Sequence, residues 1–453
     1  MARELLAGWG HTAPTAADVV TPPDAASVVS VMVSPGPRGV IARGLGRSYG
    51  DAAQNAGGAV VATARLDRMG WVDESAGLLV AGGGTSFDAI LRALIPLGWF
   101  VPVSPGTRQV TVGGAIAADV HGKNHHAGGS IAGHVAALTL ATPTGVREVT
   151  PGSDPELFWA TAGGMGLTGV ILEATIRMLP IQTSSVLTTT ERLGDLAAVM
   201  EQMVSGDADH RYSVAWVDCL ARGRSLGRAV LTRGDHAGLD DLSPARRADP
   251  LAYDPRRRAG VPALPCGVVT RATVRLFNEA WYRRGPRKAT GLVPIPAFFH
   301  PLDAVAGWNH LYGPGGFVQY QLAVPDGAEG VVETVLVLLS SLGLPAALGV
   351  LKRFGPADPG PLSFPISGWT LALDLPARLP GLGATLDAFD ELVAGAGGRV
   401  YLAKDARLRP DLVRAMYPRL VEWQAVRGRV DPDGALQSDL GRRLGLVEGR
   451  RAA

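Results

Sequence analysis

Glycines and hydrogen-bond donors gather in one short segment near the N-terminus. Arg43-Gly44-Leu45-Gly46-Arg47-Ser48-Tyr49-Gly50-Asp51 directly follows a predicted strand, Gly39–Ala42. Successive glycines can turn backbone N–H groups toward one point and so form a site for an anion such as a pyrophosphate. Arg47 and Ser48 would add side-chain donors. Taken alone, the segment is equally compatible with a glycine-rich surface turn.

The spacing of these glycines does not match a nicotinamide-binding loop. A dinucleotide-binding Rossmann loop has the pattern GxGxxG and leads into an apolar helix. Here the third glycine, Gly50, comes one residue late and a polar segment follows it. We therefore exclude nicotinamide binding at this loop.

Two further segments consist mainly of small residues. Ser104-Pro105-Gly106-Thr107 is followed by the run from Thr111 to Gly122, and a third cluster extends from Gly163 to Ile171. Such runs pack poorly in a core, but they let a large flat group approach the backbone closely. Together the three segments predict a site for a flat dinucleotide.

The elements around these segments indicate an α+β protein. Short strand-like runs with glycine turns extend to about residue 178, and longer helices alternate with strands after Pro180. Helices are predicted at Ala25–Val33, Ser86–Ile95 and Leu302–Leu311, and a loop-like basic stretch at 250–296. We expect a cofactor domain at 1–184, a substrate domain on an antiparallel sheet at 185–398, and a C-terminal segment, 399–453, that returns to the first domain.

Composition excludes several classes of protein. Of 453 residues, 47% are hydrophobic and 19% are charged, which is typical of a globular chain rather than a disordered one. The formal charge of +2 argues against general nucleic-acid binding. Cys219 and Cys266 lie far apart, so neither a disulfide framework nor a zinc site is expected, and no metal is predicted. We expect no targeting segment and no membrane span.

The order of the three segments resembles the FAD-binding domain of the vanillyl-alcohol oxidase superfamily. The resemblance implies that the first loop binds the pyrophosphate and that the second segment lines the isoalloxazine. Many members attach the flavin to a histidine of the first loop or to a cysteine. This chain has Arg47 and Ser48 where that histidine is expected, and its cysteines are remote from these segments. FAD is therefore expected to be held non-covalently.

Further motifs resemble one family within that superfamily, the actinobacterial decaprenylphosphoryl-β-D-ribose 2-oxidases. They are His121-Gly122-Lys123-Asn124-His125-His126, Glu156–Ala160, Glu279–Arg283, His300–Asp303 and Tyr401–Asp405. The resemblance implies oxidation of the ribose C2 hydroxyl of a polyprenylphosphoryl-β-D-ribose, with hydride transfer to FAD, to give a 2-keto sugar. A separate NAD(P)H-dependent keto-reductase would complete the epimerisation, which supplies an arabinose donor for cell-wall arabinan.

The resemblance also assigns site residues. Loss of hydride requires removal of the hydroxyl proton, so we expect His121 in the proton path and Lys404 in orientation and electrostatic stabilisation. The residues expected to contact FAD are Arg43, Gly44, Leu45, Gly46, Arg47, Ser48, Tyr49, Gly50, Asp51, Gly106, Thr107, Thr111, Val112, Gly113, Gly114, Ala118, Asp119, Val120, His121, Ile171 and Tyr401. Those expected to contact the substrate are Tyr49, Phe299, Gln319, Gln321, Thr370 and Lys404.

Gln319 and Gln321 alternate with Tyr320 in a predicted strand, so both amides face one side, where they suit sugar hydroxyls or form a polar sheet face. Three positions depart from the family: Phe299 replaces a tyrosine, Thr370 an asparagine and Ala372 a cysteine. Two alternatives therefore stay open. One is a soluble sugar-alcohol or aldonolactone FAD oxidase that uses oxygen, and the other is a flavoprotein that binds lipid or a partner without turnover.

Basic residues are concentrated between Arg256 and Lys288, where nine arginines and lysines accompany one acid, Glu279. With the apolar residues among them, they could contact a lipid phosphate or an anionic membrane surface. The alternative is a solvated loop. A location at the cell envelope, peripheral to the plasma membrane, is expected from the family.

Overall fold

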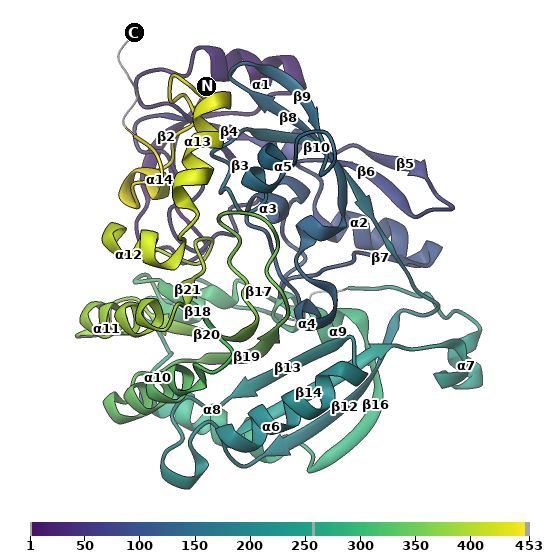
Figure 1. Cartoon of the computed structure of the whole chain (residues 1–453). Helices are drawn as coiled ribbons and strands as arrows, with labels where there is room; N and C mark the ends of the chain where they lie inside the picture. The colour runs from purple at the N-terminus through teal and green to yellow at the C-terminus, as the bar shows by residue number, and fades with distance from the viewer. Residues whose placement is uncertain (1, 256–258, 449–453) are drawn as a thin grey trace.

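The computed structural model describes residues 2–255 and 259–448. Two regions lie one above the other in Figure 1, the first built mainly on a four-stranded and a five-stranded sheet and the second on a sheet of eight strands. This mixture of helices and mainly antiparallel sheets confirms the predicted α+β class. The domain boundaries at residues 184 and 398 stay predictions.

The first region holds two sheets packed around the glycine-rich segments. The first sheet has the order β1 (Ala2–Leu6), β2 (Thr15–Val20), β4 (Ala59–Ala62), β3 (Val40–Arg43). The second has the order β5 (Met69–Asp73), β6 (Leu78–Gly82), β10 (Val170–Arg177), β8 (Val135–Thr142), β9 (Gly145–Val149). Helices α1 (Ala25–Val33) and α2 (Phe87–Leu94) confirm two predictions, and the Ser86 hydroxyl caps α2 by accepting a bond from the Ala89 N–H at 3.1 Å.

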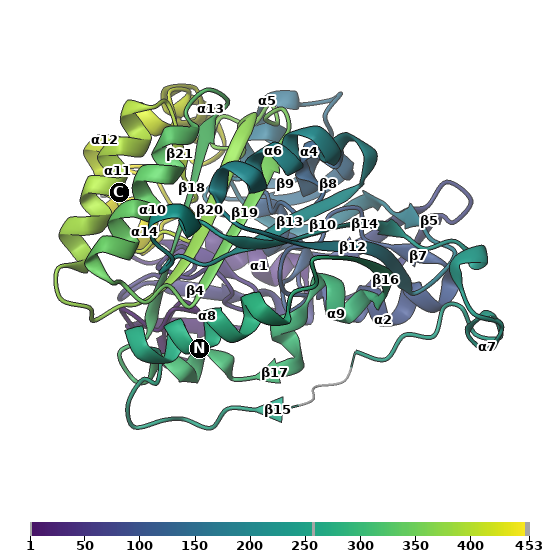
Figure 2. The same ribbon diagram turned by 90° about the horizontal axis from the view of Figure 1, so that it is seen from below.

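The second region is built on an eight-stranded antiparallel sheet. Its strands are, in order, β16 (Lys288–Pro294), β12 (Ser185–Leu193), β14 (Ala229–His236), β13 (Tyr212–Val217), β19 (Leu348–Phe354), β20 (Gly368–Pro376), β18 (Phe317–Pro325) and β21 (Arg399–Val400). Helices α6 (Leu196–Gly206) and α8 (Arg271–Arg284) lie on opposite sides of it (Figure 2). Tyr320 of β18 packs on Phe389 of α11 (Leu382–Gly395), with ring centroids 5.7 Å apart. Because side chains alternate along a strand, Gln319 and Gln321 face the first region.

The last helices lie against the first region, where they appear in yellow in Figure 1. They are α12 (Pro410–Met416), α13 (Leu420–Val430) and α14 (Asp439–Arg443). The indole of Trp423 donates to the Ala160 carbonyl at 2.9 Å, and Leu436 forms a bridge with Val40 of β3. The C-terminal segment is thus held beside the glycine-rich loop.

The remaining helices and strands are short connections, apart from the longer helix α10. They are β7 (Trp99–Phe100), α3 (Val112–Ala117), α4 (His125–Gly128), α5 (Pro155–Thr161), β11 (Leu179–Pro180), α7 (Pro244–Arg247), β15 (Ala259–Gly260), α9 (Ile295–Phe299), β17 (Val305–Ala306) and α10 (Glu329–Leu342). Of the helices in residues 2–255 and 259–448, none has the length and apolar character needed to cross a membrane.

Two predictions about elements are wrong. The segment predicted as a helix at Leu302–Leu311 forms two short 3₁₀ turns around β17, because Gly307 adopts a left-handed conformation with φ +65°. The stretch 250–296, predicted as a loop, contains α8 and the edge strand β16. Thr270 caps α8 by accepting a bond from the Thr273 N–H, which fixes the start of the helix.

Candidate active site

The glycine-rich loop of residues 43–51 offers an anion-binding backbone. Gly46 has φ +64°, a conformation that glycine adopts without steric cost. The N–H groups of Leu45, Gly46 and Ser48 have no acceptor in the described part of the chain. Backbone donors of this kind, next to a left-handed glycine, fit the pyrophosphate of FAD.

Several side chains of this loop stabilise its shape. The Arg43 guanidinium donates to the carbonyls of Ala7 at 2.7 Å and Ala53 at 3.1 Å, and Asp51 pairs with Arg443 at 2.7 Å. The side chains of Arg43 and Asp51 are therefore directed at the chain, so any contact that they make with FAD would come from their backbone. Arg47 lies 3.9 Å from the centroid of the Trp9 ring.

In the second small-residue segment, Asp119 has a strained backbone conformation and a carboxyl group of which one oxygen lacks a hydrogen-bond partner among the described residues. Asp119 is buried and has φ +44°, which is unfavourable for a residue with a side chain. Its Oδ2 accepts a bond from Ser363 Oγ at 2.8 Å, but its Oδ1 has no partner among the described residues. Burial, with the nearby Asp358, raises the pKa of Asp119, so the group can carry a proton. A flavin ring would complete its hydrogen bonding, and the residues present fit FAD.

Other polar groups in this segment are already engaged. Thr111 caps α3, since its Oγ1 accepts a bond from the Gly114 N–H at 3.1 Å. Thr107 Oγ1 donates to Asp303 at 2.7 Å and accepts from the Gln109 N–H. The Thr107 hydroxyl thus links the two regions. Because it is already bonded to other parts of the chain, the structure does not support the expected contact of this side chain with FAD. Next to Gly106, by contrast, an added Cβ would meet no atom within 4 Å.

The third small-residue segment packs against the chain itself. Gly169 has φ +159°, and a Cβ there would lie 2.7 Å from the Ala141 carbonyl oxygen. A Cβ on Gly163 would lie 3.2 Å from the Leu362 carbonyl oxygen. Close approach of neighbouring backbone explains both glycines without any ligand. Ile171 is buried at the start of β10, and its contact with FAD stays a prediction.

The two strand glutamines meet the first region at two points. Gln321 Nε2 lies 2.9 Å from His121 Nε2 and donates to Thr370 Oγ1 at 3.2 Å. Gln319 Nε2 donates to Asp374 Oδ1 at 2.5 Å and lies 3.3 Å from the Tyr49 hydroxyl.

Lys404 lies beside the contact between Gln319 and Tyr49, with its Nζ 4.0 Å from the Tyr49 ring centroid. Tyr401, three residues earlier, donates from its hydroxyl to the Ala118 carbonyl at 2.7 Å, and its ring centroid lies 5.5 Å from that of His121. The structure therefore brings seven of the predicted site residues together: His121, Lys404, Tyr49, Tyr401, Gln319, Gln321 and Thr370. Their roles stay predictions.

Sequence reasoning missed two lysines in this cluster. Lys352 of β19 places its Nζ 3.0 Å from His121 Nδ1 and 3.3 Å from the Gly122 carbonyl oxygen. Lys123 donates to the Phe298 carbonyl. The chain has only four lysines among its 43 lysines and arginines, and three of the four lie in this cluster. The rarity of lysine could therefore have pointed to these residues from the sequence alone. Asp374 was missed as well.

Burial controls the charge of these groups. It lowers the pKa of His121 well below its usual value, and Lys352 adds to the effect, so the imidazole is neutral. Burial lowers the pKa of both Lys123 and Lys352 to about 7. It also lowers the pKa of Lys404, which Asp374 partly opposes. The site therefore contains amines that can gain or lose a proton near neutral pH.

The ring of Phe299 and the imidazole of His126 make their contacts outside this cluster, although the Phe299 carbonyl accepts from Lys123 at 3.4 Å. Phe299 belongs to an aromatic group with Phe100 and Tyr212, and Lys123 approaches its ring no closer than 5.5 Å. His126 Nε2 bonds to the His210 carbonyl at 2.8 Å. Within residues 2–255 and 259–448, no group of three histidine, cysteine or acidic side chains could hold a metal ion.

Comparison with known proteins identifies the chain's relatives. Residues 16–150 match the FAD-binding domain family, and residues 381–444 match the D-arabinono-1,4-lactone oxidase family. An uncharacterised protein of Streptomyces coelicolor is 46% identical over 79% of this chain and 99% of its own length. The decaprenylphosphoryl-β-D-ribose oxidase of Mycolicibacterium smegmatis is 43% identical over 98% of this chain and 97% of its own length. The chain therefore belongs to the decaprenylphosphoryl-β-D-ribose oxidase family and is an FAD-dependent oxidoreductase.

Proposed function

We propose that this protein oxidises the ribose C2 hydroxyl of a polyprenylphosphoryl-β-D-ribose to the 2-keto sugar. One observation carries the proposal: a neutral, buried His121 held between Gln321 and Lys352 where the two regions meet. The relative from M. smegmatis, whose name specifies decaprenylphosphoryl-β-D-ribose, supports this substrate.

His121 accepts the hydroxyl proton in this proposal. When Lys352 is protonated it donates to Nδ1, so the single N–H of the imidazole is on Nε2 and must face the amide oxygen of Gln321, because an amide nitrogen only donates. When Lys352 is neutral, Nδ1–H donates to the amine and Nε2 accepts from the Gln321 amide, a position that the sugar hydroxyl would take in the reaction. The pKa of Lys352, lowered by burial to about 7, makes both states accessible near neutral pH.

The other groups orient the sugar and stabilise charge. Gln319, Gln321 and Thr370 offer donors and acceptors for hydroxyl groups on one face of the sheet. Lys404, beside Tyr49, supplies positive charge close to the reacting carbon. FAD, when bound, provides the acceptor for the hydride that leaves C2.

The test is anaerobic bleaching of the FAD absorbance by polyprenylphosphoryl ribose, compared with simple alditols and aldonolactones. We expect bleaching by the lipid-linked sugar alone, and in His121→Gln a loss of about 10²–10⁴-fold in rate at unchanged FAD content. The match of residues 381–444 to D-arabinono-1,4-lactone oxidase is the reason to test a second candidate, an aldonolactone oxidase. Faster bleaching by an aldonolactone would establish that candidate and reject the first.

We also propose that FAD is held without a covalent bond. In the described part of the chain Cys219 is buried beside the Val217 carbonyl and Cys266 is exposed, and loop 43–51 contains no histidine. Acid precipitation should release intact FAD, whereas yellow colour retained in the pellet would contradict this.

The 2-keto product needs a reductase to become an epimer. Because the loop at residues 43–51 does not fit a nicotinamide, we propose that a separate NAD(P)H-dependent keto-reductase supplies the second hydride. Incubation with the substrate alone should stop at the keto sugar. Formation of the arabinose epimer by this chain alone would exclude the need for a partner.

A peripheral contact with an anionic membrane is proposed for α8. Leu276, Phe277 and Trp281 are 73%, 49% and 46% exposed, and Arg275 and Arg284 lie beside them on the helix. Apolar and aromatic side chains flanked by arginines suit the interface of an anionic bilayer, and the lipid-linked substrate would reside there. Three of the basic residues noted in the sequence, Arg256, Arg257 and Arg258, lie outside the described residues.

Co-sedimentation with vesicles of neutral or anionic lipid tests this contact, and with it the proposed location at the cell envelope. Binding should require anionic lipid and should fall in Leu276→Ser/Phe277→Ser. Val421→Ser, which changes a residue 64% exposed on α13, is the matched control. Equal sedimentation of all variants, or none with anionic vesicles, would refute the assignment of α8.

A further inference from the structure

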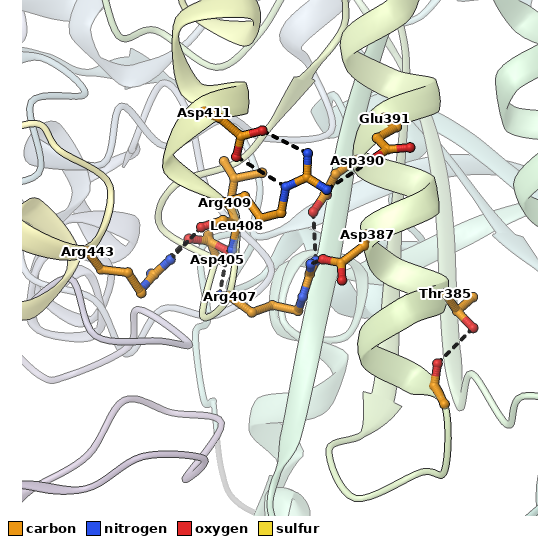
Figure 3. Close-up of polar contacts among 11 residues, drawn as sticks. Thr385, Asp387, Asp390, Glu391, Asp405, Arg407, Leu408, Arg409, Asp411 and Arg443 are labelled. Atoms are coloured by element: carbon orange, nitrogen blue, oxygen red, sulfur yellow. Dashed lines mark hydrogen bonds and ion pairs between the residues drawn. The ribbon is translucent and has the colours of Figure 1, made fainter.

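The loop that carries Lys404 is joined to the glycine-rich loop by one arginine of the C-terminal helix. Arg443 of α14 donates from Nε and Nη2 to the two carboxylate oxygens of Asp51, at 3.0 and 2.7 Å. The same Nη2 donates to Asp405 Oδ2 at 2.9 Å, as Figure 3 shows. We call Asp51, Arg443 and Asp405 the interloop clamp.

Backbone contacts make the two loops approach closely at this clamp. The Tyr49 N–H donates to the Ala403 carbonyl at 3.0 Å, and a Cβ on Gly50 would overlap the Asp405 carbonyl oxygen. The side chain of Asp405 is only 3% exposed. Its Oδ1 accepts bonds from the N–H groups of Arg407 and Leu408 at 2.8 and 2.7 Å, which close the turn after Lys404.

The far end of the same loop is held mainly by arginines that reach other helices, and Arg443 Nη1 also donates to the Leu408 carbonyl there at 3.1 Å. In Figure 3, Arg407 reaches Asp387 and Asp390 of α11, and Arg409 reaches Glu391 and Asp411. These contacts fix residues 407–409 to the second region. The clamp ties the Asp405 side chain to loop 43–51, where the fit to FAD is found, and Lys404 itself contacts that loop at the Tyr49 ring.

We infer that Arg443 is a positioning residue that holds Lys404 over Tyr49 through Asp405. Arg443 touches neither substrate nor FAD in this role. Its planar guanidinium bonds two carboxylates at once, which the single ammonium of a lysine cannot reproduce. The inference depends on the proposed function for the role of Lys404 in catalysis, but the placement of Lys404 can be measured without a substrate.

The first experiment measures access to Lys404 in the FAD-loaded protein. Brief acetylation followed by peptide mapping gives the labelling of Lys404 relative to Lys288, an exposed lysine on β16. We expect labelling of Lys404 to rise several-fold in Arg443→Gln, less in Arg443→Lys, and not at all in Arg409→Gln, the control from an exposed pair on the same loop. Unchanged labelling of Lys404 in both Arg443 variants would overturn the inference.

The second experiment measures FAD bleaching by the substrate in the same variants. A displacement of about 1 Å costs roughly 100-fold in rate, so Arg443→Gln should lose about that factor, with partial recovery in Arg443→Lys. A loss in Arg443→Gln equal to that in Arg409→Gln would also overturn the inference. A wild-type protein that shows no bleaching with this substrate, while labelling of Lys404 still changes in the Arg443 variants, would reject the proposed substrate and retain the positioning role of Arg443.

Discussion

The free energy of unfolding of Lys352→Met tests whether the buried charge of Lys352 destabilises the folded protein. Lys352 is enclosed between His121 and the Gly122 carbonyl, and burial lowers its pKa from 10.5 to about 7. In the unfolded chain the amine is hydrated and recovers its ordinary pKa. Methionine has a similar length and no charge, so the substitution removes the penalty and retains most of the volume.

The size of the effect follows from this shift of the pKa. One pKa unit corresponds to about 1.36 kcal/mol, so 3.5 units give an upper limit of about 4.8 kcal/mol for charging Lys352 in the folded state. Part of the side chain stays accessible, which reduces the penalty to roughly 2–4 kcal/mol. Below pH 7 both the folded and the unfolded chain are protonated at Lys352 and the full penalty acts, and at pH 7, where the folded chain is about half protonated, most of it still acts.

The sign of the pH dependence is fixed by linkage. Between pH 7 and 10.5 the unfolded chain holds a proton on Lys352 that the folded chain lacks, so the free energy of unfolding rises with pH. The stabilisation of Lys352→Met over wild type should therefore be greatest at pH 7. By pH 9 it should shrink by up to about 2.7 kcal/mol, two units at about 1.36 each.

Urea unfolding at pH 7 and pH 9, with FAD in equal excess, measures this difference. Lys288→Met, which removes an exposed lysine, is the control and should show no such change between the two pH values. A Lys352→Met protein that is less stable than wild type by the same amount at both pH values would refute the reasoning. Lys352 would then be a well-solvated cation, and the proton acceptor state of His121 would need another explanation.

Two further predictions concern the sheet face. Ala372→Cys restores the thiol that the family has at this position, so inhibitors that attach to that cysteine should form a stable adduct with the variant and none with the wild type, as read by mass spectrometry. Thr370→Val removes the hydroxyl that accepts from Gln321 Nε2 at 3.2 Å. The same hydroxyl donates to the Leu322 carbonyl at 2.8 Å, so two buried hydrogen bonds are lost. This should lower kcat/KM by about 10-fold with unchanged FAD content, and a value equal to wild type would contradict the role of Thr370.

Local patterns predicted much of the fold. The helices predicted at Ala25–Val33 and Ser86–Ile95 follow from apolar spacing, which acts within one or two turns. The alternation around Tyr320 correctly placed Gln319 and Gln321 on one face. These features depend on neighbours in the sequence, so a single sequence suffices to predict them.

The features that the sequence did not predict depend on contacts between distant parts of the chain. Lys352 meets His121 across 231 residues because β19 lies beside β20, and β20 beside β18, in a fixed register. No local pattern specifies that register. Likewise α8 is rich in arginine and has little helical patterning, but Trp281 packs against Trp216 of β13 and stabilises it on the sheet.

The charge distribution explains why the site is formed from two regions. Lys123 and the neutral His121 belong to the first region, whereas Lys352 and Lys404 come from the second, so the three lysines meet only in the folded protein. Besides burial, Lys352 and Lys404 lower the pKa of His121, Lys123 and Lys404 lower that of Lys352, and Asp374 opposes the lowering at Lys404. An anion placed beside Lys404 favours its protonated form, as Asp374 already does. The site is thus best completed by a negatively charged ligand, and a phosphoryl sugar satisfies that requirement where a neutral alditol does not.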